Sequence, residues 1–139
     1  MYCNKNMDKK LLDNIRTGNL LLVKESIKRG AYTNGYDNYA LKLSIGIKDV
    51  EIFKCLFENG ANSDSDNRNI LGQAIENGSL EIVKYLVQFG LNIDLDNDIS
   101  LIRAEFNGHE EVVNYFIERG ARIDEDGRRS VILIDFTGV

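Results

Sequence analysis

Apolar and polar positions along the chain recur with a period of 30 residues. Glycine stands at 30, 60, 90 and 120, and an apolar pair precedes each glycine at the same distance: Leu22-Val23, Ile52-Phe53, Ile82-Val83 and Val112-Val113. A second, mostly apolar pair follows one helical turn later: Ser26-Ile27, Leu56-Phe57, Leu86-Val87 and Phe116-Ile117. A fixed period of about 20 to 50 residues indicates an array of stacked structural repeats.

Residues 66–94 show what one repeat contains. Leu71, Ala74 and Ile75 have the spacing of a short amphipathic helix, and residues 80–89 carry an apolar stripe typical of a second helix. Gly78 between them is expected to close the first helix and Ser79 to cap the second, while Gly90 supplies a left-handed C-terminal cap. Neither helix is long enough to be stable alone, so the pattern predicts an all-α fold stabilised by stacking.

These residues resemble the ankyrin repeat. Gly108-His109-Glu110-Glu111-Val112-Val113 and Gly78-Ser79-Leu80-Glu81-Ile82-Val83 are similar to the family's central signature, and Gly60-Ala61 and Gly120-Ala121 match the end of its second helix. The resemblance implies an all-α ankyrin-repeat solenoid of helix–turn–helix units joined by short loops or hairpins. It divides the chain into an N-terminal tail at 1–7 and a single domain at 8–139. That domain comprises an N-capping repeat at 8–33, internal repeats at 34–63, 64–93 and 94–123, and a terminal half-repeat at 124–139.

Two departures from the family pattern narrow the resemblance. The period is 30 residues, where ankyrin repeats have about 33. The usual Thr-Pro-Leu-His start of the first helix is replaced, for example by Tyr39-Ala40-Leu41-Lys42. Both features resemble the shortened ankyrin arrays of giant amoeba viruses, which implies a viral protein that interacts with host factors in the host cytoplasm.

Composition removes several classes of function. The net charge of -5 argues against a nucleic-acid partner, because phosphate binding relies on clustered lysine and arginine. There is no 18-residue apolar run, so we expect no membrane span. With Cys3 and Cys55 as the only cysteines, a disulfide framework is not expected, and we place the chain in the cytoplasm.

Nothing in the sequence assembles a catalytic centre. His109 is the only histidine, which excludes histidine-based triads and multi-histidine metal sites, and no phosphate-binding glycine loop is present. By resemblance His109 should cap the second helix of its repeat and pack between repeats. Cys55 stands in a helix column occupied elsewhere by Glu25, Tyr85 and Tyr115, which favours a packing role. We therefore expect no enzyme activity, no catalytic residue and no cofactor.

Two loop features have alternative interpretations. Asp94, Asp96, Asp98 and Glu105 stand at ligand positions of a helix-flanked calcium loop, but Ile99 occupies the position that needs glycine. We interpret these acids as solvated loop residues and expect no metal. By resemblance, Asn34 stands at a position that is hydroxylated in some ankyrin proteins, and an unmodified turn residue is the favoured interpretation.

The resemblance also implies that a protein partner binds the concave face, which combines loop tips with the exposed side of each first helix. Aromatic anchors dominate interface energetics, so Tyr36, Tyr39 and Phe106 are the main candidates. Aspartates make the rim acidic, which indicates a partner with a basic patch, although solvated loops without any such preference are equally consistent with the pattern. The predicted partner-binding residues are Tyr36, Asn38, Tyr39, Lys42, Asp66, Arg68, Asp96, Asp98, Arg103, Phe106, Asp126 and Arg128.

The apolar C-terminal segment Val131–Ile134 has four explanations. It forms a single closing helix, a short strand or a homodimer contact, or the chain is a fragment of a longer protein. The closing helix is favoured because residues 130–138 keep the repeat register. The function that follows is a non-catalytic protein-interaction module, a monomer or a homodimer formed through this half-repeat. The alternative is a self-associating structural module.

Overall fold

The computed structural model describes residues 5–33, 35–61, 67–91, 100–119, 121–122 and 132–133, with side chains at 8–33, 38–61, 69–91 and 100–119. Within these ranges the chain forms eight α-helices and two strands of two residues each. The chain divides into two compact units, residues 1–70 and 71–139, and the division falls inside α5 (Asn67–Glu76). The expected all-α helix–turn–helix architecture is confirmed, with the strand pair as an addition.

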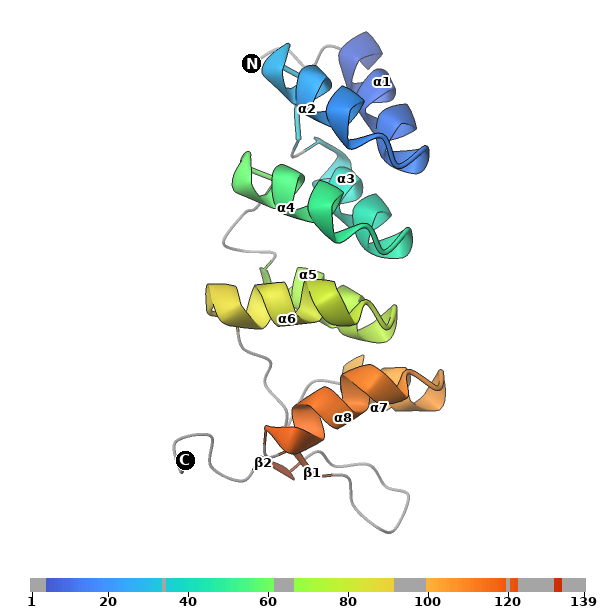
Figure 1. Cartoon of the computed structure of the whole chain (residues 1–139), viewed down its shortest axis with the longest axis vertical. Helices are drawn as coiled ribbons and strands as arrows, with labels where there is room; N and C mark the ends of the chain where they lie inside the picture. The colour runs from blue at the N-terminus through green and yellow to red at the C-terminus, as the bar shows by residue number, and fades with distance from the viewer. Residues whose placement is uncertain are drawn as a thin grey trace. The chain divides into compact units, whose positions relative to one another are not determined.

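The first unit contains two helix pairs. Helix α1 (Lys5–Arg16) packs against α2 (Leu20–Lys28), and α3 (Gly35–Gly46) packs against α4 (Val50–Glu58). The pairs stack in register, because α1 contacts α3 and α2 contacts α4 (Figure 1). First helices therefore form one row and second helices another. Helix α1 begins at Lys5, three residues before the start of the domain that the sequence predicts.

The second unit repeats the pattern. Helix α5 leads through a tight turn into α6 (Leu80–Phe89), and α7 (Ser100–Phe106) packs against α8 (Glu110–Glu118). The second helices α6 and α8 contact each other, as their counterparts do in the first unit. Turn hydrogen bonds run from Gly78 N to Ile75 O and from Gly108 N to Glu105 O, both 3.0 Å.

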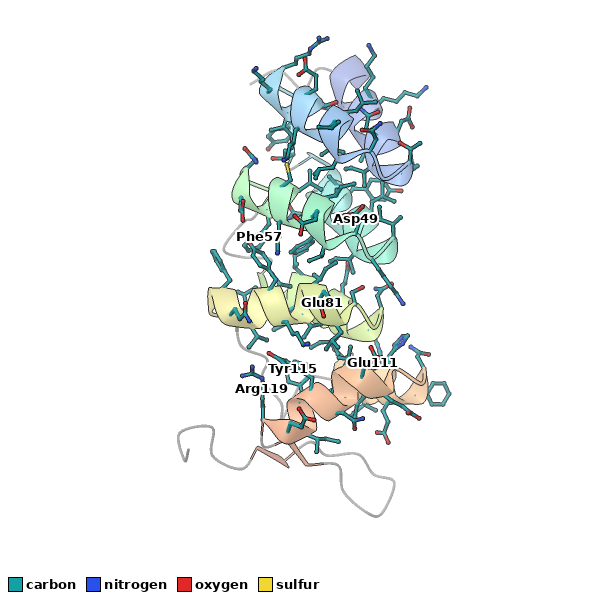
Figure 2. The ribbon with its side chains drawn as sticks, viewed as in Figure 1. Asp49, Phe57, Glu81, Glu111, Tyr115 and Arg119 are labelled. Carbon is teal, nitrogen blue, oxygen red and sulfur yellow. The ribbon has the colours of Figure 1, made fainter. Side chains whose placement is uncertain are left out.

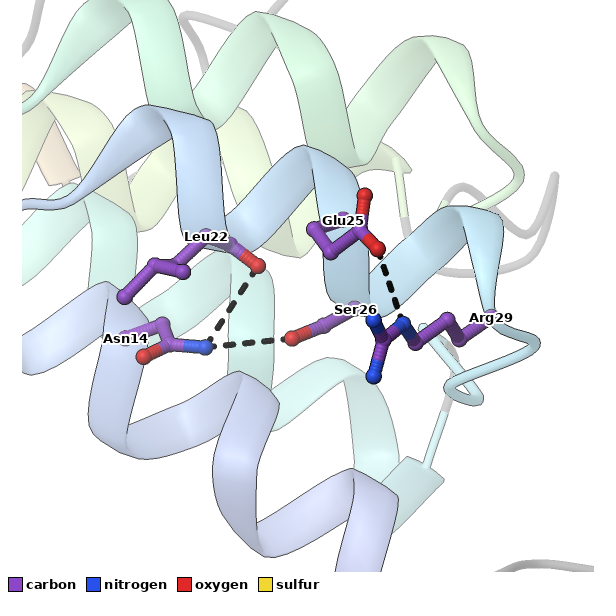
Figure 3. A network of polar contacts seen from close by, with 5 residues as sticks. All are labelled: Asn14, Leu22, Glu25, Ser26 and Arg29. Atoms are coloured by element: carbon purple, nitrogen blue, oxygen red, sulfur yellow. Dashed lines mark hydrogen bonds and ion pairs between the residues drawn. The ribbon is translucent and has the colours of Figure 1, made fainter.

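The core follows the columns of the repeat. Ile52, Ile82 and Val112 occupy one column and are buried, whereas Leu22, in the same column of the first repeat, is 48% exposed. Polar groups replace apolar ones beside it. Ser26 stands in the column of Leu56, Leu86 and Phe116, and its hydroxyl accepts a 3.1 Å hydrogen bond from Asn14 Nδ2 (Figure 3). The Asn14 amide also donates to the Leu22 carbonyl at 3.4 Å, so polar contacts join α1 and α2 beside Leu22.

The turn between the two helices of a repeat needs a residue whose backbone is in the left-handed conformation, with a positive φ. Gly18, Gly78 and Gly108 supply it with φ values of 69°, 69° and 79°. Lys48 occupies the same column with φ 58°, a conformation that costs a side-chain-bearing residue energy. Gly90 ends α6 with φ 114°. The predicted roles of Gly78 and Gly90 are confirmed.

The residue after that turn is the N-cap of the second helix. The side chains of Asn19 and Asp49 both accept a 3.1 Å hydrogen bond, from the backbone N–H of Leu22 and Ile52 respectively. Ser79 and His109 are the N-cap residues of α6 and α8, as predicted, but their side chains make no cap hydrogen bond. The His109 ring instead lies against Gly78 of the preceding repeat. A Cβ placed on Gly78 would come within 2.6 Å of His109 Cγ.

The C-terminal segment differs from the expectation. Strand β1 (Ala121–Arg122) pairs antiparallel with β2 (Ile132–Leu133), with Ala121 opposite Leu133 and Arg122 opposite Ile132. The favoured closing helix is therefore wrong at residues 132 and 133, where the short strand, one of the four explanations, is present. Isoleucine and leucine suit either conformation, and backbone pairing with residues 121–122 determines the outcome. The rest of the predicted half-repeat lies outside the described residues.

Candidate protein-binding surface

In the first unit, the exposed side of the first helices presents an aromatic–arginine pair. Tyr39 on α3 is 40% exposed, and its phenol lies beside the guanidinium of Arg16 at the end of α1. The Tyr39 phenol is the main reason why the pKa of the Arg16 guanidinium is raised, and the Asp13 carboxylate, 3.0 Å away, adds to it. The pair therefore links two successive repeats and holds a cation beside an accessible ring.

Other predicted residues of this unit lie differently from the expectation. The predicted loop tip 36–38 lies in α3, and Asn38 is buried. Its φ of 60° shows that the backbone turns sharply there, which asparagine tolerates better than most residues. The assignment of Asn38 to the partner-binding surface is therefore wrong. Lys42, one helical turn further, is half-buried on α3, and the side chain of Tyr36 lies outside the described residues.

In the second unit, α7 presents a second aromatic–arginine combination. Phe106 at the end of α7 is 80% exposed, the largest exposed fraction among the large apolar side chains that the structure describes. Arg103, one turn earlier, donates a 3.1 Å hydrogen bond from Nη1 to Oε1 of Glu76 at the end of α5. This ion pair joins two repeats and fixes the arginine in the neighbourhood of the ring.

The remaining predicted residues give less information. Arg68 lies in α5, which begins at Asn67, so its assignment to a loop tip is wrong, and its side chain lies outside the described residues. Four predicted aspartates and one arginine lie outside the described residues altogether: Asp66, Asp96, Asp98, Asp126 and Arg128. Asn34 and the aspartates of the calcium-loop pattern also lie outside them.

Sequence reasoning missed one contributor to these surfaces, Arg16. Arg16 and Glu76 stand in the same repeat column as Phe106, and each interacts with one of the predicted residues. The signal was present, because the column 16, 46, 76 and 106 lies on the exposed side of every first helix. Which residues pair across repeats depends on side-chain geometry, which the column alone does not give.

A groove of about 600 Å³ lies between α2 and α4 on the row of second helices. Leu20, Ile27 and Cys55 contribute to its walls, together with the charged residues Lys24 and Glu58. Burial raises the pKa of the Cys55 thiol, Glu58 raises it further, and Lys24 opposes them. The thiol is therefore protonated near neutral pH and is a poor nucleophile.

No group of three or more histidine, cysteine, aspartate or glutamate side chains among the described residues is placed to hold a metal ion. None of the described helices is both long and apolar enough to cross a membrane.

Comparison with known proteins supplies the family. A protein-family model described as "Ankyrin repeats (3 copies)" matches residues 11–97 and 38–127, which together cover most of the chain. Comparison with curated proteins finds no match. The paired helices, the left-handed turn between them and their stacking in register agree with the family match. The chain therefore belongs to the ankyrin-repeat family.

Proposed function

We propose that the chain is a non-catalytic module that binds a protein partner through the exposed side of its first helices. Ankyrin repeats are general protein-interaction modules, and the family match supports this class of function. The observation that carries the choice of surface is Phe106, whose ring is 80% exposed and stands one turn from an arginine held by an ion pair. Aromatic and arginine side chains are the residues that contribute most to interface energies.

The first unit supports the same choice of surface. Tyr39 and Arg16 form a pair of the same chemical kind on the equivalent side of α1 and α3. Holding an arginine in place before binding reduces the side-chain entropy that a partner must overcome. Lys42 extends this surface along α3. Each unit thus offers an anchor ring with a positioned cation.

Affinity capture with matched variants tests the proposal. The wild-type chain is compared with Phe106→Ser and with Leu21→Ser, whose side chain is 79% exposed on α2, in the row of second helices. We expect a protein that the wild type and Leu21→Ser retain and Phe106→Ser releases. Equal retention by all three variants contradicts the proposed surface, and loss with Leu21→Ser alone assigns binding to the second helices.

Several finer features of the proposal rest on the sequence. A partner with a basic patch follows from the acidic loop tips of the sequence, and binding that does not weaken with added salt contradicts it. A role as a viral host-interaction factor in the host cytoplasm rests on the 30-residue period and its resemblance to giant-virus arrays. Expression of a tagged chain in amoeba cells, followed by fractionation, tests the location.

Self-association through the C-terminal half-repeat is the second candidate function. Ile132 and Leu133 pair with Ala121–Arg122 of the same chain, so part of the apolar segment already has a backbone partner. The molar mass in solution tests this candidate. A dimer that Ile132→Asp converts to a monomer supports it, and a monomeric wild type contradicts it.

A further inference from the structure

The last turns of the second helices carry an interacting pair four residues apart, at the same place in three repeats. In α2, Arg29 Nε donates to Glu25 Oε1 at 2.8 Å. At the end of α4, Asn59 Nδ2 donates to the Cys55 carbonyl at 2.7 Å. In α8 the guanidinium of Arg119 stacks on the Tyr115 ring, 4.5 Å from its centroid, and Figure 2 shows the two residues side by side. This pair of positions thus holds an ion pair, Glu25 with Arg29, in the first repeat and an aromatic–cation pair, Tyr115 with Arg119, in the fourth.

Arg119 differs from the other arginines whose side chains the structure describes. Arg16 contacts Asp13 at 3.0 Å, Arg29 contacts Glu25 at 2.8 Å and Arg103 contacts Glu76 at 3.1 Å. Among the described residues, Arg119 has no carboxylate within ion-pair distance, although Glu118 precedes it directly. A guanidinium stacked on a ring uses its face and keeps its N–H groups, which lie in its plane, for another acceptor.

The surroundings of Arg119 are aromatic and fixed in place. Tyr115 lies edge-on to the buried Phe116, with ring centroids 5.3 Å apart, and its hydroxyl oxygen is buried. Phe89 occupies the column of Arg119 in the preceding repeat and is 57% exposed at the end of α6, a helix that contacts α8. Phe89 and Arg119 thus stand at equivalent ends of two helices that contact each other, and the guanidinium of Arg119 lies over the Tyr115 ring.

We propose that Arg119, Tyr115 and Phe89 form a binding site for an acidic peptide segment. A carboxylate of the segment accepts two hydrogen bonds from the edge of the Arg119 guanidinium, a geometry in which arginine matches carboxylates. An apolar side chain next to that carboxylate covers the exposed Phe89 ring. This surface belongs to the second helices, so it is separate from the Phe106 surface and independent of the proposed function.

Titration with a pair of matched peptides tests the site. The probe is a blocked decapeptide of alternating glutamate and leucine, and its control replaces every glutamate with glutamine. Both are added to the ¹⁵N-labelled full chain while the Arg119 Nε–Hε signal and the amide signals of α6 and α8 are followed by NMR. We expect the acidic peptide to shift these signals saturably and to bind about tenfold more tightly than the glutamine peptide, because hydrogen bonds between charged groups are the stronger ones.

Three variants separate this site from general charge attraction. Arg119→Gln should weaken binding of the acidic peptide about tenfold, while Arg29→Gln, which removes the same charge from a closed ion pair, should leave it unchanged. Glu118→Gln removes a neighbouring negative charge and should tighten binding about twofold. Equal shifts with both peptides, equal losses in Arg119→Gln and Arg29→Gln, or shifts confined to α5 and α7 would each overturn the proposal. Unchanged thermal unfolding of the variants shows that the site, and not the fold, has been altered.

Discussion

At the scale of single residues, the inter-helix turn shows how one position can carry two constraints. Gly78 has a left-handed backbone, and the His109 ring of the next repeat fills the space where a side chain would start. Gly108 has the same backbone conformation, but no atom of the described residues lies within 4 Å of the corresponding point. A side chain at Gly108 therefore meets only the energetic cost of the left-handed backbone, whereas a side chain at Gly78 also meets the cost of displacing the His109 ring.

Alanine substitution at both glycines should measure the contact. Gly108→Ala should destabilise the chain by about 1 kcal/mol, the cost of a left-handed residue with a side chain. Gly78→Ala should cost about 1 to 3 kcal/mol more, because the new methyl group forces the imidazole out of its place. In the His109→Ala background the two substitutions should cost the same. Urea unfolding of the four variants tests this, and an equal cost in the wild-type background would contradict it.

Lys48 offers the opposite experiment. It holds φ 58° in the turn where three other repeats have glycine, so Lys48→Gly should stabilise the chain by about 0.5 to 1 kcal/mol. Lys10→Gly is the matched control, because this exposed lysine lies inside α1 and its replacement should cost about 1 kcal/mol. Thermal unfolding of both variants checks the two signs. A loss of stability with Lys48→Gly would show that its side chain makes a contact worth more than the strain.

The Cys55 thiol should titrate above its ordinary pKa of 9.0, chiefly because of burial. In a Cys3→Ser background, the rate of alkylation by iodoacetamide should reach half its maximum above that pH, and Lys24→Gln should raise the midpoint further. The folded state holds the proton more tightly than the unfolded state. The stability that this thiol contributes is therefore full below the unfolded pKa and is lost as the pH rises through the folded pKa. A midpoint at or below that of the unfolded chain would contradict the assigned environment.

At the scale of helices, N-terminal capping differs between the two units. The side chains of Asn19 and Asp49 accept hydrogen bonds from backbone N–H groups in the first turns of α2 and α4. Ser79 and His109 make no such side-chain bond to α6 and α8. The helices of the second unit therefore rely more on stacking than on local capping. The same turn serves both arrangements, because the left-handed residue before the N-cap, which is glycine in three repeats and Lys48 in the other, sets the backbone path.

Removing a cap should cost stability in the first unit. Asp49→Ala should destabilise the chain by about 1 kcal/mol, while Asp49→Asn, which keeps an acceptor oxygen, should cost only a few tenths, or roughly 0.3 kcal/mol. Hydrogen exchange should show the change at Ile52 N–H, which donates to Asp49 Oδ1. Equal costs for the two variants would mean that the charge, and not the hydrogen bond, stabilises α4.

Most helices could be predicted from the sequence because each has a column of apolar residues and a glycine at its end. Leu71, Ala74 and Ile75 are all buried in α5, and Ile82, Val83 and Leu86 in α6, as the spacing predicts. The starts of the first helices were harder. Residues 36–38 carry polar groups typical of a loop, yet α3 begins at Gly35 and includes them, with Asn38 at a φ of 60° inside the helix.

The sequence predicts that the candidate binding residues lie on the row of first helices, but it does not predict which residues pair with each other. Tyr39, Arg103 and Phe106 lie exposed on first helices, which the repeat register implies. The Tyr39–Arg16 pair and the ion pair of Arg103 with Glu76 join residues from different repeats. Long side chains reach several neighbours, so sequence spacing alone does not select the partner. The C-terminal strand was only one of four explanations for a related reason, because it depends on backbone pairing between segments ten residues apart.

At the scale of the whole molecule, each of the two units presents its own candidate surface on the first helices. The first unit carries Tyr39 with Arg16, and the second carries Phe106 with Arg103. In the second unit, the Arg119 surface adds a different chemistry on the second helices. Such a division would let one small chain engage two kinds of partner, since repeat surfaces vary while the stacked core is kept.

Site-specific photo-crosslinking tests the central claim most directly. A photoreactive benzoyl-phenylalanine is placed at position 106 in one variant and at the equally exposed position 21 in another, and each is irradiated in cell extract. A binding module that uses the first helices should give a discrete adduct with another protein from position 106 and none from position 21. An adduct from position 21 alone, or the same adducts from both positions, would contradict it.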